Sequence, residues 1–300
     1  MIPYSATLGY STLLDQLSVA ALADLDRLLR AVEGEPPEVQ REALMDLLPL
    51  LGDEYVGASS LVSAQFFAEL QVMQEIRNPI APETLDGVER SRWHALAGWG
   101  ARGSVLEQGG AALMFSLVSG GLTKALTEAA ADTMIGNAEL QGGGLSAQRV
   151  PRPGCCAFCG MLASRGAAYT AETGGKVVGR GVPVGQGRGR GSKGRGRGIK
   201  PRGSQRIGED FHDHCRCKVV ILTDKNEAEL QATAEKYYDA YADAYKATGK
   251  NVERNVISYM DTAGNRHNLY EWVDEGGDVL SDKQRRNRIV AEMRESLGVK

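Results

Sequence analysis

Two short segments of this 300-residue chain combine residue types that bind metal ions or carry out thiol chemistry. One reads PGCCAFCGML and the other FHDHCRC, and together they contain all five cysteines and two of the four histidines. In order, these residues are Cys155, Cys156, Cys159, His212, His214, Cys215 and Cys217. An odd number of clustered cysteines argues against a disulfide framework and favours a reducing compartment, such as the cytoplasm, with metal or redox chemistry.

The spacing of these residues predicts a structural zinc site. Cys156 and Cys159 have the Cys-x-x-Cys spacing with which one tight turn supplies two thiolates to a tetrahedral ion. His212 and Cys215 form a second pair that completes four ligands. The alternates for these positions are Cys155, His214 and Cys217. A zinc ion shared by both pairs would stabilise a small Cys/His knuckle directly.

Other uses of the same residues stay open. A disulfide could link the two segments in an oxidising environment, and the adjacent Cys155 and Cys156 allow several pairings. A catalytic dyad, for example Cys156 with His214, would need one activated thiolate. The cysteines could also be unligated core residues. Five cysteines with no separate activating context resemble ligands more than one nucleophile, so no catalytic residue is assigned.

A glycine- and arginine-rich segment lies between the two halves of the predicted zinc site. Residues 174–208 contain 13 glycines, ten Lys or Arg residues and no acidic residue, so the net charge of −3 for the whole chain leaves about −13 elsewhere. Such a segment buries too little apolar surface to offset the entropy of ordering, and we expect a disordered insert. Its cations could bind nucleic acid in a sequence-independent, salt-sensitive way. The residues assigned to this role are Arg180, Arg188, Arg190, Lys193, Arg195, Arg197, Lys200, Arg202 and Arg206. The alternatives are a solvated linker and a segment that docks on the acidic surface of the chain itself.

The region before the cysteines is predicted to be helical. Apolar residues recur at steps of three and four from Val19 to Val32, and GEPP at residues 34–37 ends that helix and starts the next. Ser59 and Ser60 are expected to cap a third helix, which ends by residues 78–79. Further helices are expected over residues 83–99 and 106–134, and QGGG at residues 141–144 marks a domain boundary.

The region after the cysteines is predicted to contain one short strand and two helices. Residues 218–224 are rich in β-branched residues, as a strand would be. A helix is expected from about Glu227 to Thr248, with a Tyr-rich face that forms a contact surface (Tyr237, Tyr238, Tyr241 and Tyr245). RHNLYEWVDEG is read as a hairpin or small docking segment, and a capped terminal helix should follow Ser281.

These patterns predict a mainly α protein with a small α+β Cys/His knuckle. The expected parts are a helical N-terminal domain over residues 1–144, a knuckle domain over residues 145–224 that includes short strands and the insert, and a helical C-terminal region over residues 225–300. Nothing at the start resembles a signal peptide, and the longest apolar run, AALMFSLV, is shorter than the roughly 20 residues of a membrane span. We therefore expect no membrane partner.

The cysteine segments resemble a known family. CCAFCGMLASRGAAY followed by FHDHCRCKVV is similar to the signature of the phage Mu F-like minor head proteins, also called head morphogenesis proteins. Cys156 and Cys159 match the first pair of that signature, and its second part is matched by His212, Cys215, Arg216 and Cys217. The layout is similar to that of versions from phages of actinobacteria. The sequence departs from the pattern in the additional Cys155 and in the long insert.

The resemblance implies a minor capsid protein that acts in head assembly. Its expected partners are the portal protein, the major capsid protein and possibly packaged double-stranded DNA. Its expected location is the portal vertex inside the phage head, and the host cytoplasm during assembly. One alternative is a capsid maturation protease, for which only the cysteine and histidine segments offer candidate residues. Another is a nucleic-acid-binding module without a capsid role.

Overall fold

The computed structural model describes residues 4–85, 87–108, 110–142, 146–152, 155–164, 169–170, 217–222, 226–250, 252–260 and 266–299. It contains two compact units, the first formed by Met1–Arg152 with Gly166–Gln231 and the second by Pro153–Arg165 with Ala232–Lys300. Each unit is described by itself below. The domain limits expected from the sequence, at residues 144 and 224, stay predictions.

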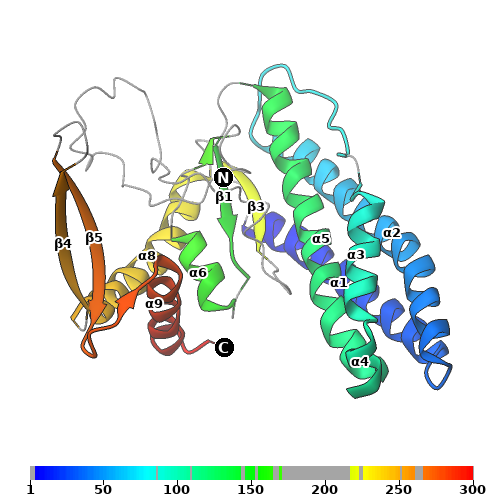
Figure 1. Ribbon diagram of the computed structural model, residues 1–300. Coiled ribbons are helices and arrows are strands. Elements are labelled where there is room, and N and C mark those ends of the chain that lie inside the picture. Colours follow the sequence, from blue (N-terminus) through cyan, green and yellow to red (C-terminus); the bar gives the residue numbers. More distant parts are fainter. Residues whose placement is uncertain are drawn as a thin grey trace. The chain divides into compact units, whose positions relative to one another are not determined.

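Long helices form most of the first unit (Figure 1). They are α1 (Tyr4–Ala31), α2 (Pro37–Met73), α3 (Arg90–Gly100), α4 (Gly103–Gln108) and α5 (Gly110–Gln141). α1, α2 and α5 pack against one another, and α3 packs on α2 and α5. Their shared core contains Leu25, Leu48, Trp93 and Leu122, each almost fully buried. The predicted helical N-terminal region is confirmed.

The expected break at Ser59 and Ser60 is wrong, because α2 continues through both residues. Ser59 and Ser60 are buried in the middle of the helix instead of capping a new one. The hydroxyl of Ser63 donates to the carbonyl oxygen of Ser59 at 2.8 Å and lies 3.0 Å from the hydroxyl of Tyr10 on α1. These two bonds satisfy the hydroxyl of Ser63 inside the bundle and join α2 to α1.

The helix expected over residues 83–99 begins only at Arg90, and side-chain amides from α2 and α5 bond the backbone of residues that precede it. Gln71 both accepts from the N–H of Ile80, at 2.8 Å, and donates to its carbonyl oxygen, at 3.0 Å. Asn137 on α5 pairs in the same way with Glu83, at 2.8 and 2.7 Å. The two amides replace the backbone hydrogen bonds that a helix would make here. The helix expected over residues 106–134 is found as α4 and α5, and α5 extends to Gln141.

A buried carboxylate links α3 to α5. Glu128 on α5 is 7% exposed, forms an ion pair with Arg92 and lies 3.9 Å from Lys124 Nζ. Burial raises the pKa of Glu128 above its ordinary value of 4.5, because the loss of water disfavours the carboxylate more than the two cations favour it. The folded chain therefore binds this proton more tightly than the unfolded chain does.

We expect Glu128→Gln to raise the stability of the first unit at pH 7. A raised pKa favours folding at low pH, and this contribution is lost as the pH rises from 4.5 through the folded-state pKa. The glutamine keeps an acceptor for Arg92 without the buried charge. Thermal unfolding between pH 4 and pH 8 should show a flatter pH profile for the variant. The matched Arg92→Ala should be destabilised at pH 7, and an equal loss in both variants would contradict the prediction.

A small antiparallel sheet with strand order β2-β1-β3 also belongs to the first unit. Its strands are β1 (Ser146–Val150), β2 (Tyr169–Thr170) and β3 (Lys218–Leu222), and residues 146–150 of β1 pair with residues 222–218 of β3. Val220 on β3 packs with Leu230 at the start of the following helix. The side chain of Gln148 donates to the Leu230 carbonyl oxygen at 2.7 Å. The strand predicted at residues 218–224 is confirmed over residues 218–222.

The second unit packs helices against one another and against an antiparallel sheet of order β4-β5-β6. Its elements are α6 (Ala157–Ala163), most of α8 (Glu227–Lys250), β4 (Val252–Met260), β5 (Arg266–Asp274), β6 (Val279–Leu280) and α9 (Asp282–Leu297). The helix predicted from Glu227 is confirmed, with an end at Lys250. The segment RHNLYEWVDEG forms β5 of a hairpin, and the sequence analysis did not identify its partner β4.

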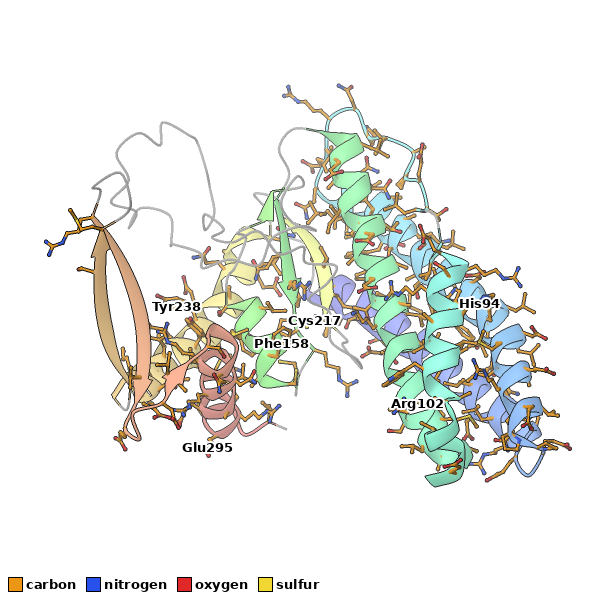
Figure 2. The ribbon with its side chains drawn as sticks, in the orientation of Figure 1. His94, Arg102, Phe158, Cys217, Tyr238 and Glu295 are labelled. Atoms are coloured by element: carbon orange, nitrogen blue, oxygen red, sulfur yellow. The ribbon has the colours of Figure 1, made fainter. Side chains whose placement is uncertain are left out.

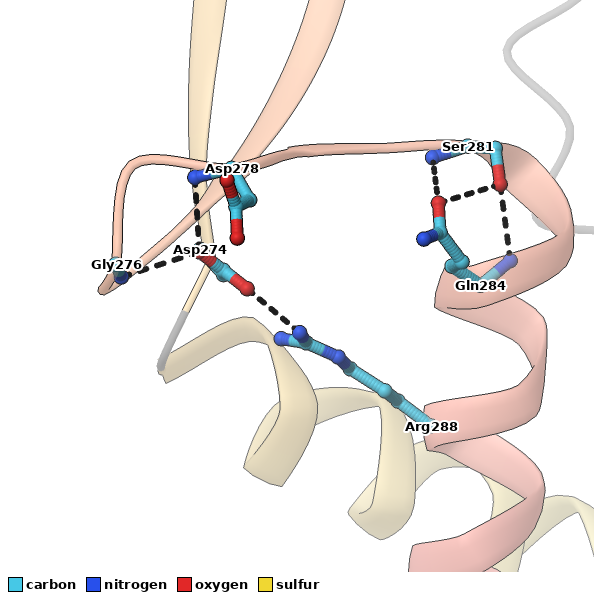
Figure 3. A network of polar contacts seen from close by, with 6 residues as sticks. All are labelled: Asp274, Gly276, Asp278, Ser281, Gln284 and Arg288. Carbon is cyan, nitrogen blue, oxygen red and sulfur yellow. Dashed lines mark hydrogen bonds and ion pairs between the residues drawn. The ribbon is translucent and has the colours of Figure 1, made fainter.

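The terminal helix α9 begins where the sequence predicted, after Ser281. The hydroxyl of Ser281 accepts from the backbone N–H of Gln284, whose side chain accepts from the backbone N–H of Ser281 (Figure 3). Arg288 reaches from α9 to Asp274 at the end of β5, with 2.6 Å between Nη2 and Oδ2. The capping box fixes the start of the helix, and the ion pair joins it to the hairpin. The prediction of a mainly α protein with small β elements is confirmed.

Candidate metal centre

The first cysteine segment forms the start of helix α6. Cys156 is the N-cap residue, and its Sγ accepts a hydrogen bond from the backbone N–H of Cys159 at 3.5 Å. Its carbonyl oxygen accepts from the N–H of Gly160 at 3.1 Å, which closes the first turn. A backbone N–H directed at sulfur favours the charged thiolate over the neutral thiol. The turn therefore places one thiolate-stabilising donor inside the Cys-x-x-Cys motif.

The adjacent cysteines differ in their surroundings. Cys155 is half-buried and its Sγ donates to the hydroxyl oxygen of Tyr237 on α8, at 3.6 Å. Cys159 is buried, with 3% of its surface exposed. The contacts thus associate Cys156 with Cys159 and direct Cys155 toward α8.

A Tyr-rich face of α8 packs behind this turn. A Cβ atom on Gly160 would lie only 2.9 Å from Cδ1 of Tyr237, so this close approach requires glycine. Tyr241 and Tyr245 pack into the same core as Ala157 of α6 and α9 residues such as Met293. The face expected to make contacts is therefore internal at these positions, whereas Tyr238, labelled in Figure 2, is 41% exposed.

Of the second cysteine segment, the structure describes only Cys217. Cys217 is 1% exposed and directly precedes β3 (Figure 2). The neighbouring Lys218 places Nζ 3.3 Å from Oδ1 of Asp15 on α1, and Nη1 of Arg152 lies 3.7 Å from the other oxygen of that carboxylate. Asp15 was not singled out in the sequence, because nothing in its local pattern signals a partner about 200 residues away.

The other predicted ligands and the predicted nucleic-acid-binding cations lie outside the described residues. These are His212, His214 and Cys215, together with the nine Lys and Arg residues of the segment 174–208 that were assigned to nucleic-acid binding. Within the described ranges, no group of three or more His, Cys, Asp or Glu residues is placed to hold a metal ion. Cys156 and Cys159 offer two sulfur donors in one turn, which fits half of a tetrahedral zinc site. The full ligand set stays a prediction.

The aromatic residues of α3 have packing roles. Trp93 is fully buried, and its Nε1 donates to Oδ1 of Asp53 on α2 at 2.7 Å. Trp99 is 45% exposed. The guanidinium carbon of Arg102 lies over the Trp99 ring, 5.1 Å from the ring centroid. His94, labelled in Figure 2, is half-buried on the same helix. Trp93 therefore has a packing role in the core of the first unit.

Comparison with known families gives one match that covers most of the chain. The family model described as VG15 protein matches residues 1–244, which include the helices of the first unit and both cysteine segments. Searches of curated proteins and of solved structures gave no match. None of the helices in the described ranges is both long and apolar enough to span a membrane.

Proposed function

The chain belongs to the VG15 protein family, a phage-associated family, and from this membership we propose that it is a minor capsid protein of the phage Mu F-like type. The observation that carries the proposal is the family match over residues 1–244, which includes the Cys-x-x-Cys turn. The proposed location is the portal vertex inside the phage head. The proposed partners are the portal protein and the major capsid protein, bound during assembly in the host cytoplasm.

Purified phage particles provide the test of this role. Quantitative mass spectrometry should find the chain in the particle at far fewer copies than the major capsid protein. Co-expression with the portal protein, followed by affinity purification under reducing conditions, should recover both proteins together. Absence of the chain from particles would overturn the proposal.

The knuckle is proposed to hold one structural zinc ion through Cys156, Cys159, His212 and Cys215. The N–H of Cys159 that points to Cys156 Sγ supports Cys156 as the ligand in preference to Cys155, whose sulfur is directed to Tyr237. Bound zinc would supply a structural cross-link between the two cysteine segments.

Elemental analysis of protein purified under reducing conditions tests this site. We expect about one zinc ion per chain, lost in Cys159→Ala and retained in the matched Cys155→Ala. Chelation should lower the melting temperature of the wild type and leave that of Cys159→Ala unchanged. Equal zinc loss in both variants would contradict the ligand assignment. Metal-free protein with one unusually reactive cysteine would favour the alternative function, a thiol-type capsid maturation protease.

The segment 174–208 is proposed to contact packaged DNA through its cations. Deletion of these residues should weaken binding to double-stranded DNA of any sequence and reduce the dependence of that binding on salt. Incorporation into particles should be unaffected. DNA binding that is equal with and without the segment would rule out this contact.

A further inference from the structure

An exposed apolar stripe runs along the outer side of α2. It consists of Val39, Leu50, Leu61 and Val72, which are 42%, 64%, 51% and 77% exposed. Successive members are 11 residues apart, close to three helical turns, so all four lie on nearly the same side of the helix. At a rise of about 1.5 Å per residue, the stripe is roughly 50 Å long. We call it the α2 outer stripe.

The α2 outer stripe is separate from the face that α2 buries in the bundle. The buried face contains Leu44, Leu48, Val56 and Phe67, each at most 1% exposed. The helix is therefore apolar on two sides, and packing within the first unit explains only one of them. Single exposed apolar residues are normal on a protein surface, but these four recur at one regular interval on one side of the helix, where another helix laid along α2 could contact all of them.

Small residues lie between the large ones along the same line. Gly57 lies seven positions after Leu50 and four before Leu61, and a Cβ atom there would meet nothing within 4 Å. Ala43 lies four positions after Val39 and Ala68 lies four before Val72; both are half-buried, and the same line also contains Asp46, Glu54 and Gln65. The small residues at positions 43, 57 and 68 leave space along the stripe for side chains of a second helix.

The charges of α2 indicate what kind of helix would bind. Beyond Arg41, the helix has five acidic residues and no basic one; the acidic residues are Glu42, Asp46, Asp53, Glu54 and Glu69. Asp53 accepts a hydrogen bond from the neutral indole of Trp93, which leaves its charge in place. Two copies of this face would bring like charges together, whereas a helix with Lys or Arg beside its apolar residues would be attracted.

We propose that the α2 outer stripe is the docking site for an amphipathic helix of another protein, whose apolar residues are flanked by Lys and Arg. The partner helix lies along α2, with its apolar side chains between Val39, Leu50, Leu61 and Val72 and its cations toward the carboxylates. The proposal depends on neither the zinc site nor the DNA contact.

Two synthetic helical peptides test the proposal against full-length protein. Both have Leu and Ala along one face, and the flanking positions are Lys in one peptide and Glu in the other. By fluorescence anisotropy, the Lys peptide should bind the wild type and the Glu peptide should bind at least tenfold more weakly. The double variant Leu50→Gln, Leu61→Gln should lose affinity for the Lys peptide about tenfold, with an unchanged melting temperature because both residues are exposed.

The control variant is Val19→Gln, which alters an equally exposed apolar residue on α1 (57%) and should bind the Lys peptide like the wild type. Replacing Glu42, Asp46 and Glu54 by their amides should reduce the salt dependence of binding. The proposal fails if the Lys peptide does not bind the wild type, or if it binds the double variant equally well. It also fails if the wild type dimerises in sedimentation experiments and the double variant does not, because the occupant would then be a second copy of the chain.

Discussion

Trp93→Ala is expected to lower the free energy of unfolding of the first unit by about 3–5 kcal/mol. The indole is 0% exposed, lies in the core shared by α2, α3 and α5, and donates to Asp53 at 2.7 Å. Its ring lies so close to Gly52 that a Cβ atom there would be 2.6 Å from Trp93 Cζ2. Truncation therefore leaves a large cavity and removes the donor for Asp53.

Urea unfolding followed by the helical circular dichroism signal measures this effect. The matched control is Trp99→Ala on the same helix, which removes an indole that is 45% exposed and should cost less than about 1 kcal/mol. Similar losses for the two tryptophans would show that α3 does not depend on Trp93 for its attachment to the bundle. Gly52→Ala should also destabilise the unit, because either the ring or the α2 backbone must move.

Met293→Ala is expected to destabilise the second unit by about 2–5 kcal/mol. Met293 on α9 is 0% exposed and lies in a small core with Ala157, Met161 and Ile289. This core contains few large side chains, so the loss of one is a large fraction of the apolar burial that holds α6, α8 and α9 together.

Hydrogen exchange detected by mass spectrometry localises the effect of this change. Peptides from α6 and α9 should exchange faster in Met293→Ala, while peptides from α2 and α5 should keep their protection, because the two units have separate cores. The neighbouring Glu292→Ala changes an exposed residue and should leave all peptides unaffected. Loss of protection throughout the chain would instead indicate a single cooperative unit.

The residues that the sequence analysis did not identify have partners far away along the chain. The side chain of Asn137 forms two hydrogen bonds with the backbone of Glu83, which lies 54 positions earlier in the sequence. Helix α3 begins only after this segment, at Arg90. Asp15 forms ion pairs with Lys218 and Arg152, and no local sequence pattern indicates either of these pairs. Strand β4 was missed because its sequence, VERNVISYM, mixes polar and apolar residues on both faces and is identified only by its register with β5.

Local features of the sequence were enough to determine most helices, the capped start of α9, the strand at Lys218 and the Cys-x-x-Cys turn. Each of these depends on residues within a few positions of one another, through helical periodicity, a cap or β-branched side chains. Tertiary structure decided that α2 continues through Ser59 and Ser60, because both serines are buried in the bundle and the same stretch of α2 is joined to α1 through Ser63 and Tyr10. It also decided which apolar positions of α2 are buried and which form the α2 outer stripe. Periodicity marks both sides of that helix as apolar, and only the packing of α1, α3 and α5 shows which side they cover.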